Sequence, residues 1–412
     1  MRIWSFTFGC KVNQYETELL RHRLTGSDGI HVETPEEADL CLINSCSVTE
    51  FADRECRKMV RKVLRANPRA RTIVTGCYAT RAPQELKAIS DRVEVYSNQE
   101  KDELPSCFGF EVSSQPLGIH QFAGRTRAFL KIQDGCKAPC NYCIIPTVRP
   151  DMWSKPVEQV REEVQALLGN GYQEIVLTGI RLGLYQGKMD GGAKINLLNL
   201  LKKLVEVPGR FRIRLSSLEV TEVTDRLIGF VGQSNKICRH FHIPMQSGNS
   251  EVLRSMQRWY DIDLYRERVR AVREAMPDCG ITADVMVGYP TETDEQFEET
   301  ARNIEAMELS GLHVFRFSAR QGTKAAELKP LDPRVVIRRA GILGELDMVL
   351  RERFYRKHEG TQREALPERS GEAWTDNYIR VDVPLGEAGT GLSHRRVFSS
   401  HFDRKEIEKA AV

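Results

Sequence analysis

The feature that most constrains the fold of this chain is a regular alternation of short apolar strands and helices. Near the N-terminus, "RIWSFTF", "ADLCLINS", "RTIVTG" and "RVEVY" have the composition of strands, and helical patterns lie between them, including one over residues 50–66. Strands that alternate with helices pair in parallel and carry helices on both faces of the sheet. This part of the sequence therefore predicts a doubly wound parallel sheet.

A second set of strands occupies the middle of the chain. Six segments, "RAFLKIQ", "EIVLTGI", "FRIRLSS", "RHFHIPMQ", "ITADVMVGY" and "LHVFRFSAR", are separated by helical stretches. Parallel strands with outer helices predict a partial (β/α)6 barrel, whose functional face lies at the carboxyl ends of the strands. Near the C-terminus, "WTDNYIRVDVP" alternates apolar and charged residues and predicts a further strand. We expect an α/β protein with three domains, over residues 1–122, 123–355 and 356–412, the last a small β-barrel.

The composition narrows the functional classes. Of the 412 residues, 41% are hydrophobic, and no apolar run reaches the roughly eighteen residues that a membrane-spanning helix needs. The chain begins directly with a folded pattern, so we expect a cytoplasmic protein without a membrane anchor. Thiols stay reduced in the cytoplasm, so metal ligands are a better explanation than disulfides for the eleven cysteines. The net charge of +3 indicates no global affinity for nucleic acid, which local clusters must supply.

Three isolated cysteines stand at the ends of three predicted strands. Cys10, Cys46 and Cys77 each follow a strand of the N-terminal sheet, and in such sheets ligands bind beyond the carboxyl ends of the strands. Three converging thiols suit an iron–sulfur cluster with one iron left open, while a zinc ion or no metal remain alternatives. After Cys10, Asn13 and Glu16 are spaced as in a capping box, which predicts a helix start there.

A second cysteine motif follows the first strand of the predicted barrel. Cys136, Cys140 and Cys143 form a C-x3-C-x2-C loop, with the aromatic Tyr142 before the last cysteine. Three closely spaced thiolates can bind three irons of a 4Fe–4S cluster and leave the fourth open for chemistry; a zinc loop is the alternative. The remaining cysteines lack a partner at such spacing, and we expect them to be structural: Cys41, Cys56, Cys107, Cys238 and Cys279.

This loop resembles that of the radical S-adenosylmethionine (SAM) superfamily, and the whole chain resembles its methylthiotransferase family. The matching segments include "GCKVNQYETE", "INSCSVTEFADR", "VTGCYA", "GCKAPCNYCIIP", "RIRLSSLEVTEV", "HIPMQSGNSEVLRSMQR" and "DVMVGYPTETDEQFEET". The resemblance implies two 4Fe–4S clusters. Cys136, Cys140 and Cys143 would hold the one that cleaves SAM to a 5′-deoxyadenosyl radical. Cys10, Cys46 and Cys77 would hold an auxiliary cluster that delivers sulfur.

Candidate SAM contacts are small, hydroxyl-bearing or polar residues at the ends of the barrel strands. They are Tyr142, Thr178, Gly179, Ser216, Glu219 and Gly288, with the stretch 242–246 at another strand end. Each can equally be an ordinary turn residue. No side-chain acid or base is predicted beyond the cluster-binding cysteines.

The family has several branches, and "GCKVNQYE" is most similar to the one that acts on threonylcarbamoyladenosine in tRNA. This similarity implies methylthiolation at C2 of the adenosine beside the anticodon, with the anticodon stem-loop of tRNA and an electron donor such as flavodoxin or ferredoxin as partners. The alternatives are isopentenyladenosine in tRNA, an aspartate of a ribosomal protein, or an iron–sulfur RNA-binding protein without turnover. The sequence indicates no oligomeric state.

Local basic clusters are candidates for RNA binding. The helix over residues 50–66 carries Arg54, Lys58, Arg61, Lys62 and Arg65 opposite its apolar face, although a solvated helix face looks the same. Arg395 and Arg396 lie in the C-terminal domain, which resembles the RNA-binding TRAM domain, and "GLSHRRVFSSHF" fits that family poorly. The family's basic stretch after the cluster loop is reduced here to "TVRPDMWSKP", which keeps Arg149. Tyr142, Trp153 or Tyr289 can stack on an unpaired adenine.

Overall fold

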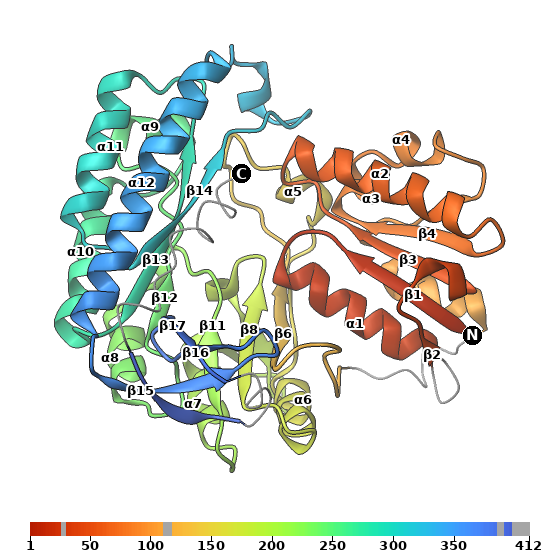
Figure 1. Ribbon diagram of the computed structural model, residues 1–412, viewed down its shortest axis with the longest axis horizontal. Helices are drawn as coiled ribbons and strands as arrows, with labels where there is room; N and C mark the ends of the chain where they lie inside the picture. The colour runs from red at the N-terminus through yellow and green to blue at the C-terminus, as the bar shows by residue number, and fades with distance from the viewer. Residues whose placement is uncertain (26–29, 110–117, 385–390, 398–412) are drawn as a thin grey trace.

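The computed structural model describes residues 1–25, 30–109, 118–384 and 391–397 of the chain. Figure 1 shows an N-terminal α/β unit beside a larger barrel, with a smaller sheet against one end of the barrel. The predicted fold class is confirmed in its main features. None of the helices within these described ranges is long and apolar enough to cross a membrane.

The N-terminal unit is a five-stranded sheet in which every strand pairs in parallel with its neighbour, in the order β2-β1-β3-β4-β5. Its strands are β1 (Arg2–Thr7), β2 (Ile30–His31), β3 (Leu40–Ser45), β4 (Arg71–Gly76) and β5 (Val93–Val95). Its helices are α1 (Lys11–Thr25), α2 (Glu50–Ala66), α3 (Cys77–Arg81) and α4 (Pro83–Lys87), with a 3₁₀ turn over Lys101–Phe108. The bounds of α2 match the prediction.

Alternation along β3 divides the helices between the two faces of this sheet. Leu40 and Leu42 pack against α1, whereas Cys41 and Ile43 pack against α2, α3 and α4. Because successive side chains of a strand point to opposite faces, a nearly continuous apolar strand is what a sheet covered on both sides requires. The helix α2 is held at its start by Thr49, whose side chain accepts a hydrogen bond from the backbone of Ala52.

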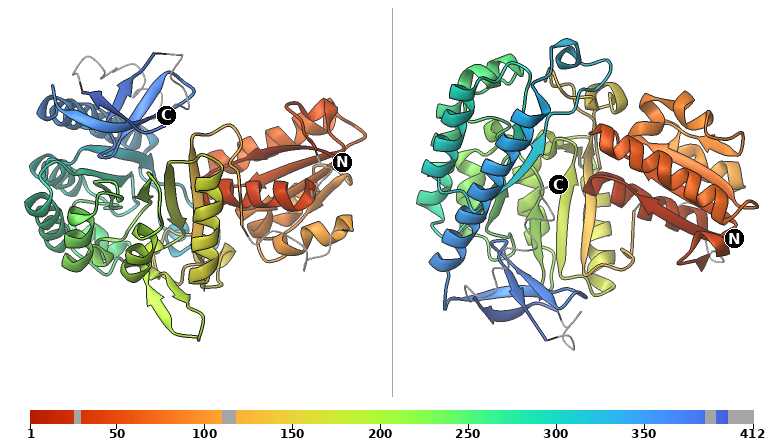
Figure 2. Two further views of the ribbon diagram at one scale, coloured as in Figure 1. Left: turned by 90° about the horizontal axis from the view of Figure 1, so that it is seen from below. Right: turned by 45° about the horizontal axis from the view of Figure 1, so that its top comes forward.

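The barrel contains the six predicted parallel strands in chain order. The first three strands pair with one another, as do the last three, and isolated β-bridges connect the third strand to the fourth strand and the segment before it. They are β6 (Arg127–Asp134), β8 (Glu174–Gly179), β11 (Arg212–Leu215), β12 (His240–His242), β13 (Gly280–Val287) and β14 (Gly311–Arg316). The main helices are α6 (Val157–Gly169), α7 (Leu197–Val205), α8 (Asp225–Gln233), α9 (Ser250–Ser255), α10 (Ile262–Ala275), α11 (Asp294–Ala306) and α12 (Pro333–Lys357). Figures 1 and 2 show the helices outside the strands. Short elements complete the unit: α5 (Ile145–Val148), β7 (Trp153–Ser154), β9 (Gln186–Lys188) and β10 (Lys194–Asn196).

The C-terminal segment forms a curled antiparallel sheet in the order β17-β16-β15-β18. Its strands are β15 (Gln362–Pro367), β16 (Glu372–Thr375), β17 (Arg380–Asp382) and β18 (Ser393–Arg396). The single strand predicted from "WTDNYIRVDVP" is a hairpin, because the backbone turns at Tyr378 with φ of 69°. The predicted alternation still holds, since Ile379, Val381 and Val383 are buried.

This sheet covers the amino ends of the barrel strands. At the start of β11, Arg212 donates to the carbonyls of Glu364 and Trp374, and Arg214 donates to those of Thr375 and Asp376. The two guanidinium groups thereby bind backbone carbonyls of the C-terminal sheet. The carboxyl ends of the strands, where the predicted site residues lie, are at the opposite end of the barrel.

Candidate functional site

The three N-terminal cysteines lie at one edge of their sheet. Cys10 stands between β1 and α1, Cys46 follows β3, and Cys77 begins α3 directly after β4. The strands β1, β3 and β4 are neighbours, so their carboxyl ends meet at this edge. The thiols are close enough that a charge on Cys77 would raise the pKa of both Cys10 and Cys46.

Two glycines make this close approach possible. Gly9 precedes Cys10 with φ of +87°, and a Cβ there would lie 2.6 Å from both Cβ and Sγ of Cys46. Gly76 precedes Cys77 with φ of +98°, and a Cβ there would lie 2.4 Å from the carbonyl oxygen of Ser45. A side chain at either position would be strained and would displace a cysteine-bearing turn.

The surroundings of these thiols suit an iron cluster better than a single zinc ion. Burial raises the pKa of Cys46 to about 12, so an iron cation would be needed to keep it as a thiolate. Asn98 points its amide nitrogen at Cys77 Sγ, 3.7 Å away. Tetrahedral zinc requires sulfur atoms about 3.8 Å apart. Among the described residues, neither cysteine trio gathers its ligand atoms within 4.8 Å of one another.

The barrel trio lies on the loop after β6. The backbone N–H of Ala138 points at Cys136 Sγ at 3.4 Å, and burial raises the pKa of Cys143 to about 12. Arg258 donates from Nη1 to Cys140 Sγ at 3.2 Å. A guanidinium and a backbone donor aimed at sulfur favour thiolates over thiols, as a bound cluster requires.

Arg258 is a site residue that the sequence reasoning missed. It follows α9, is largely buried, and also contacts Glu219 and the Tyr142 hydroxyl, the latter at 3.5 Å. Its Nε has no hydrogen-bond partner among the described residues. The only sequence signal for it is its place at the end of "HIPMQSGNSEVLRSMQR". The structure thus brings together two predicted SAM contacts, Tyr142 and Glu219, through a third residue beside Cys140.

The other predicted SAM contacts lie at the carboxyl ends of strands but have different surroundings. Thr178 is buried near the end of β8, and Gly179 allows β8 to approach Gln133, because a Cβ there would lie 2.9 Å from the Gln133 side chain. Ser216 is buried, and its hydroxyl has no partner within the described ranges. Gly288 has a packing role, since a Cβ there would lie 2.6 Å from Val336 of α12.

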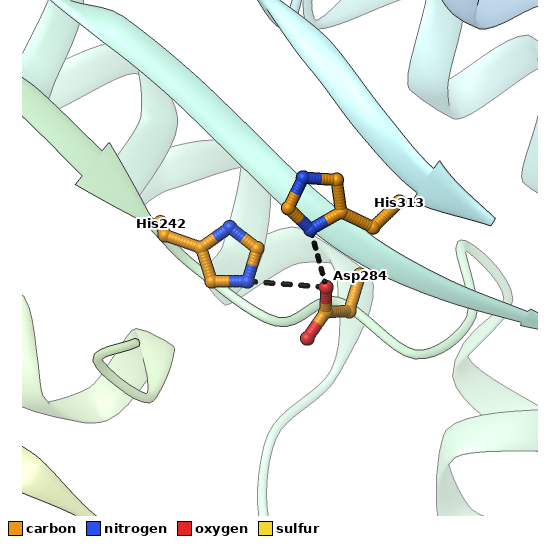
Figure 3. A group of neighbouring side chains, drawn as sticks. All are labelled: His242, Asp284 and His313. Atoms are coloured by element: carbon orange, nitrogen blue, oxygen red, sulfur yellow. Dashed lines mark hydrogen bonds and ion pairs between the residues drawn. The ribbon is translucent and has the colours of Figure 1, made fainter. Parts of the chain in front are cut away.

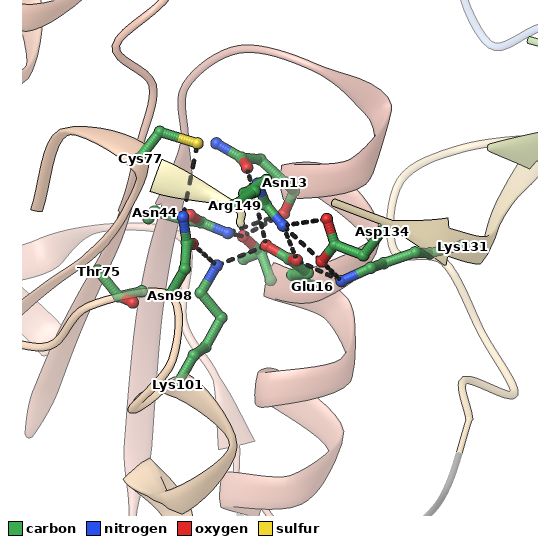
Figure 4. Close-up of polar contacts among 12 residues, drawn as sticks. Asn13, Glu16, Asn44, Thr75, Cys77, Asn98, Lys101, Lys131, Asp134 and Arg149 are labelled. Atoms are coloured by element: carbon green, nitrogen blue, oxygen red, sulfur yellow. Dashed lines mark hydrogen bonds and ion pairs between the residues drawn. The ribbon is translucent and has the colours of Figure 1, made fainter. Parts of the chain in front are cut away.

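A buried ionic cluster joins the two cysteine sites (Figure 4). Arg149, which follows α5, donates to Glu16 at 2.7 and 2.8 Å, to Asn13 at 2.9 Å and to Asp134 at 2.7 Å. Its carbonyl accepts a hydrogen bond from the backbone of Cys136. One residue therefore contacts the loop of the barrel trio and the helix that follows Cys10.

The capping box predicted for Asn13 and Glu16 is wrong. The helix α1 begins at Lys11, so both residues lie inside it. The Asn13 amide donates instead to the carbonyls of Phe8 and Ser45, which ties the turns before Cys10 and Cys46 together. Glu16 also receives Lys101 at 2.5 Å and Lys131 at 2.6 Å. Asn13 and Glu16 therefore do not cap a helix; their side chains contact the turns before the cysteines and residues of the barrel.

We expect Arg149→Met to destabilise the protein by about 3 kcal/mol, because Glu16 and Asp134 lose the buried guanidinium that they share and keep only lysine partners. The measurement is urea unfolding followed by circular dichroism. The matched control is Arg353→Met, because Arg353 forms an ion pair with Glu305 at 3.1 Å in which both side chains are more than half exposed. The control should shift stability by about 0.5 kcal/mol or less. Equal shifts in the two variants would contradict a linking role for Arg149.

The remaining predictions have mixed outcomes. Cys41, Cys56, Cys238 and Cys279 are buried as expected, whereas Cys107 is exposed. Tyr289 is fully buried and donates to the Ser255 carbonyl, so it is not available to stack on a base; Trp153 is exposed.

The predicted RNA contacts do not form one surface. Arg54, Lys58, Arg61 and Arg65 are exposed along α2 in the N-terminal unit. Arg395 and Arg396 lie on β18 of the C-terminal sheet. Figure 2 shows this sheet, in blue, apart from the N-terminal unit, in red and orange.

Comparisons with known proteins agree with this architecture. Residues 2–97 match a family described as "Uncharacterized protein family UPF0004", and residues 130–304 match the "Radical SAM superfamily". A threonylcarbamoyladenosine tRNA methylthiotransferase MtaB of Bacillus subtilis is 36% identical over 91% of this chain and 88% of its own length. A tRNA-2-methylthio-N(6)-dimethylallyladenosine synthase of Thermodesulfovibrio yellowstonii is 29% identical over 92% of this chain and 93% of its own length.

Among solved structures, the radical SAM methyltransferase TsrM of Kitasatospora setae matches with a TM-score of 0.55 and 13% identity, over 79% of this chain and 77% of that one. At this identity the match concerns the fold alone. One assignment follows from the two family matches, from the similarity to the Bacillus relative over most of the chain, and from the two cysteine trios. The chain belongs to the radical SAM methylthiotransferase family.

Proposed function

We propose that this protein methylthiolates C2 of N6-threonylcarbamoyladenosine in tRNA. The observation that carries the proposal is the presence of two cysteine trios on separate units, held together by Arg149. The Bacillus relative, named for this activity, is more similar to the chain than the dimethylallyladenosine synthase is, at 36% against 29% identity. The resemblance of "GCKVNQYE" to the same branch supports the choice.

Membership of the family implies SAM and a 4Fe–4S cluster in the barrel, and a second cluster in the N-terminal unit. We assign the first to Cys136, Cys140 and Cys143, and the second to Cys10, Cys46 and Cys77. When bound, these groups supply a 5′-deoxyadenosyl radical and sulfur, respectively. Cleavage of SAM consumes an electron, and we propose that an external donor such as flavodoxin or ferredoxin supplies it.

The residues of the chain itself bind and orient these groups. Arg258 stands beside Cys140, where its guanidinium can receive the carboxylate of SAM in a bidentate manner. Glu219, already bonded to Arg258, fixes the direction of that guanidinium. Arg149 holds the two cysteine sites in a fixed relative position, because it contacts both the Cys136 loop and α1.

We expect Arg258→Met to weaken SAM binding by about tenfold to a hundredfold, since a hydrogen bond to a charged group contributes about 1.5–3 kcal/mol. Isothermal titration of the iron-loaded protein with SAM measures this. The matched control is Arg254→Met, because Arg254 is exposed on α9 only four residues away. Visible absorption must show that both variants keep their iron. Unchanged SAM affinity in Arg258→Met would remove this residue from the binding site.

The exposed face of α2 supports RNA docking near the auxiliary cysteines. A groove of about 450 Å³ is lined by Phe51, Lys58 and Lys62 and reaches Gly9, next to Cys10. Phe51 is 62% exposed, and the Arg54 guanidinium lies 5.2 Å from the centre of its ring. Lysine and arginine bind phosphates, and an exposed aromatic ring can stack on a base. We therefore propose that the anticodon stem-loop docks along α2, beside Cys10.

Nucleoside analysis tests the proposed substrate. In tRNA from a strain lacking this protein, liquid chromatography with mass spectrometry should detect threonylcarbamoyladenosine without its methylthio derivative, and the gene should restore that derivative. Methylthio-isopentenyladenosine should be unchanged. Loss of that nucleoside instead would assign the protein to the dimethylallyl branch. Unchanged tRNA together with an unmodified ribosomal aspartate would assign it to the ribosomal branch.

A further inference from the structure

His242, Asp284 and His313 form a polar cluster in the barrel, apart from both cysteine trios. They lie on the adjacent strands β12, β13 and β14, and Asp284 and His313 are paired in register. One oxygen of Asp284, Oδ1, lies 3.1 Å from His242 Nε2 and 3.2 Å from His313 Nδ1 (Figure 3). Their strand neighbours, such as Ala283 and Leu312, belong to the apolar core beneath the helices. Since side chains alternate along a strand, the cluster faces the barrel interior.

The contacts within the cluster orient His313 toward that interior. His313 points Nδ1 at Asp284, and within the described part of the chain its Nε2 makes no hydrogen bond. His242 is held from the other side by Thr282 Oγ1, 2.9 Å from its Nδ1. Side-chain exposure rises from 11% at His242 through 27% at Asp284 to 53% at His313. The Nε2 atom of His313 is therefore available to a ligand in the barrel interior.

Positively charged side chains lie near the cluster. Beside it, burial and the positive groups of Arg214, His242, Lys11 and His313 lower the pKa of His240 well below its usual value. Lys11 directly follows Cys10, so its charge belongs to the side of the barrel nearest the auxiliary cysteines. Asp284 is a carboxylate shared by two imidazoles, which lower its pKa, so an anionic ligand binds here with an imidazole in its protonated form.

Unused hydrogen-bonding groups lie along these strands, with His240 at the amino end of β12 and Ser216 and Gln246 past the carboxyl ends of β11 and β12. His240 Nδ1, Ser216 Oγ and Gln246 Oε1 are buried and have no partner among the described residues. Each of these residues is more than nine-tenths buried. Buried polar groups without partners are costly, so a hydrocarbon ligand would leave that cost in place, whereas a polar ligand removes it.

We propose that His313, held by Asp284 and His242, binds the threonyl carboxylate and hydroxyl of the substrate adenosine. This assignment rests on the proposed function and names the residues that would distinguish its substrate from isopentenyladenosine. The neutral imidazole accepts a hydrogen bond from the hydroxyl, and the protonated imidazole donates one to the carboxylate. His313 is thus a specificity residue, and Asp284 is the positioning residue that fixes its ring.

The test uses anticodon stem-loops that carry the threonylcarbamoyl group as the free acid, the same group as its methyl ester, or an isopentenyl group. For the reconstituted protein, kcat/KM and the Kd from fluorescence anisotropy should both favour the acid over the ester by at least about tenfold. In His313→Phe this preference should fall to about twofold or less, mainly through KM, with a smaller fall in Asp284→Asn. The matched control is His31→Phe, because His31 is exposed on β2, and it should keep the full preference.

The outcomes separate this inference from the function on which it rests. If the wild-type protein modified acid and ester equally well, the inference would be wrong and the proposed function would stand. If it modified only the isopentenyl stem-loop, the proposed function would fail. One zinc or other divalent ion per chain, lost on Asp284→Asn while both clusters are retained, would show that the cluster binds a metal and would overturn the inference.

Discussion

Cys143→Ala is expected to reduce SAM cleavage at least about a hundredfold, because in the assignment proposed above this residue supplies one of three thiolates for the barrel cluster. Cys143 lies on the short loop after β6, beside the Arg258 that contacts Cys140, and the remaining pair of thiols cannot hold three irons. The measurement is the amount of 5′-deoxyadenosine formed from SAM with dithionite under oxygen-free conditions. Both deoxyadenosine and the methylthio nucleoside should be lost.

The matched control for this variant is Cys107→Ala, because Cys107 is exposed and lies outside both trios. It should keep both outputs. Iron content should fall from about eight to about four per chain in Cys143→Ala, since one of two four-iron clusters is lost. Normal deoxyadenosine formation by Cys143→Ala would remove this cysteine from the SAM site.

Cys10→Ala is expected to abolish the methylthio nucleoside while leaving most deoxyadenosine formation. Cys10 belongs to the N-terminal sheet, whose apolar clusters are separate from the core of the barrel, so the barrel site should survive the substitution. Deoxyadenosine and the modified nucleoside are quantified in the same reaction. The two cysteine variants should lose different products if the two sites perform different steps as proposed, and this asymmetry is the diagnostic result.

A folding defect must be separated from a chemical one in Cys10→Ala. Circular dichroism and iron content should show an intact fold with about four irons, because loss of a metal site can also unfold its domain. Gly9→Ala provides a second variant, since its Cβ would displace the Cys46 turn while all six ligand cysteines remain. We expect it to lose the same output as Cys10→Ala. A normal yield of methylthio nucleoside from Cys10→Ala would refute an auxiliary role for this cysteine.

Local patterns were sufficient to predict most of the fold. The helix α2 is amphipathic over its whole length and begins after a capping threonine, so its bounds follow from residues within a few turns. The six barrel strands are short apolar segments separated by helices, and all six form. The hairpin at Tyr378 was missed although Asp376 and Asn377 are turn-forming residues, because the alternation on either side of them continues in phase.

Contacts between distant segments were not predictable in the same way. Arg149 and Glu16 are 133 positions apart in the chain, and Cys140 and Arg258 are 118 apart, so no local pattern links them. Glu16 illustrates the consequence, because its spacing from Asn13 fits a helix cap while its carboxylate binds Arg149 of another domain. The cysteines were accessible to sequence reasoning because each stands directly at the end of a recognisable strand.

The measurement that tests the central claim most directly follows the hydrogen at C2 of the substrate. A stem-loop whose threonylcarbamoyladenosine carries deuterium at C2 is incubated with the reconstituted protein, SAM and a reductant. Mass spectrometry should find that deuterium in 5′-deoxyadenosine, in an amount equal to the methylthio nucleoside formed. Methylthio nucleoside accompanied by deoxyadenosine without deuterium would contradict radical abstraction at C2, and with it the reaction proposed for the barrel site.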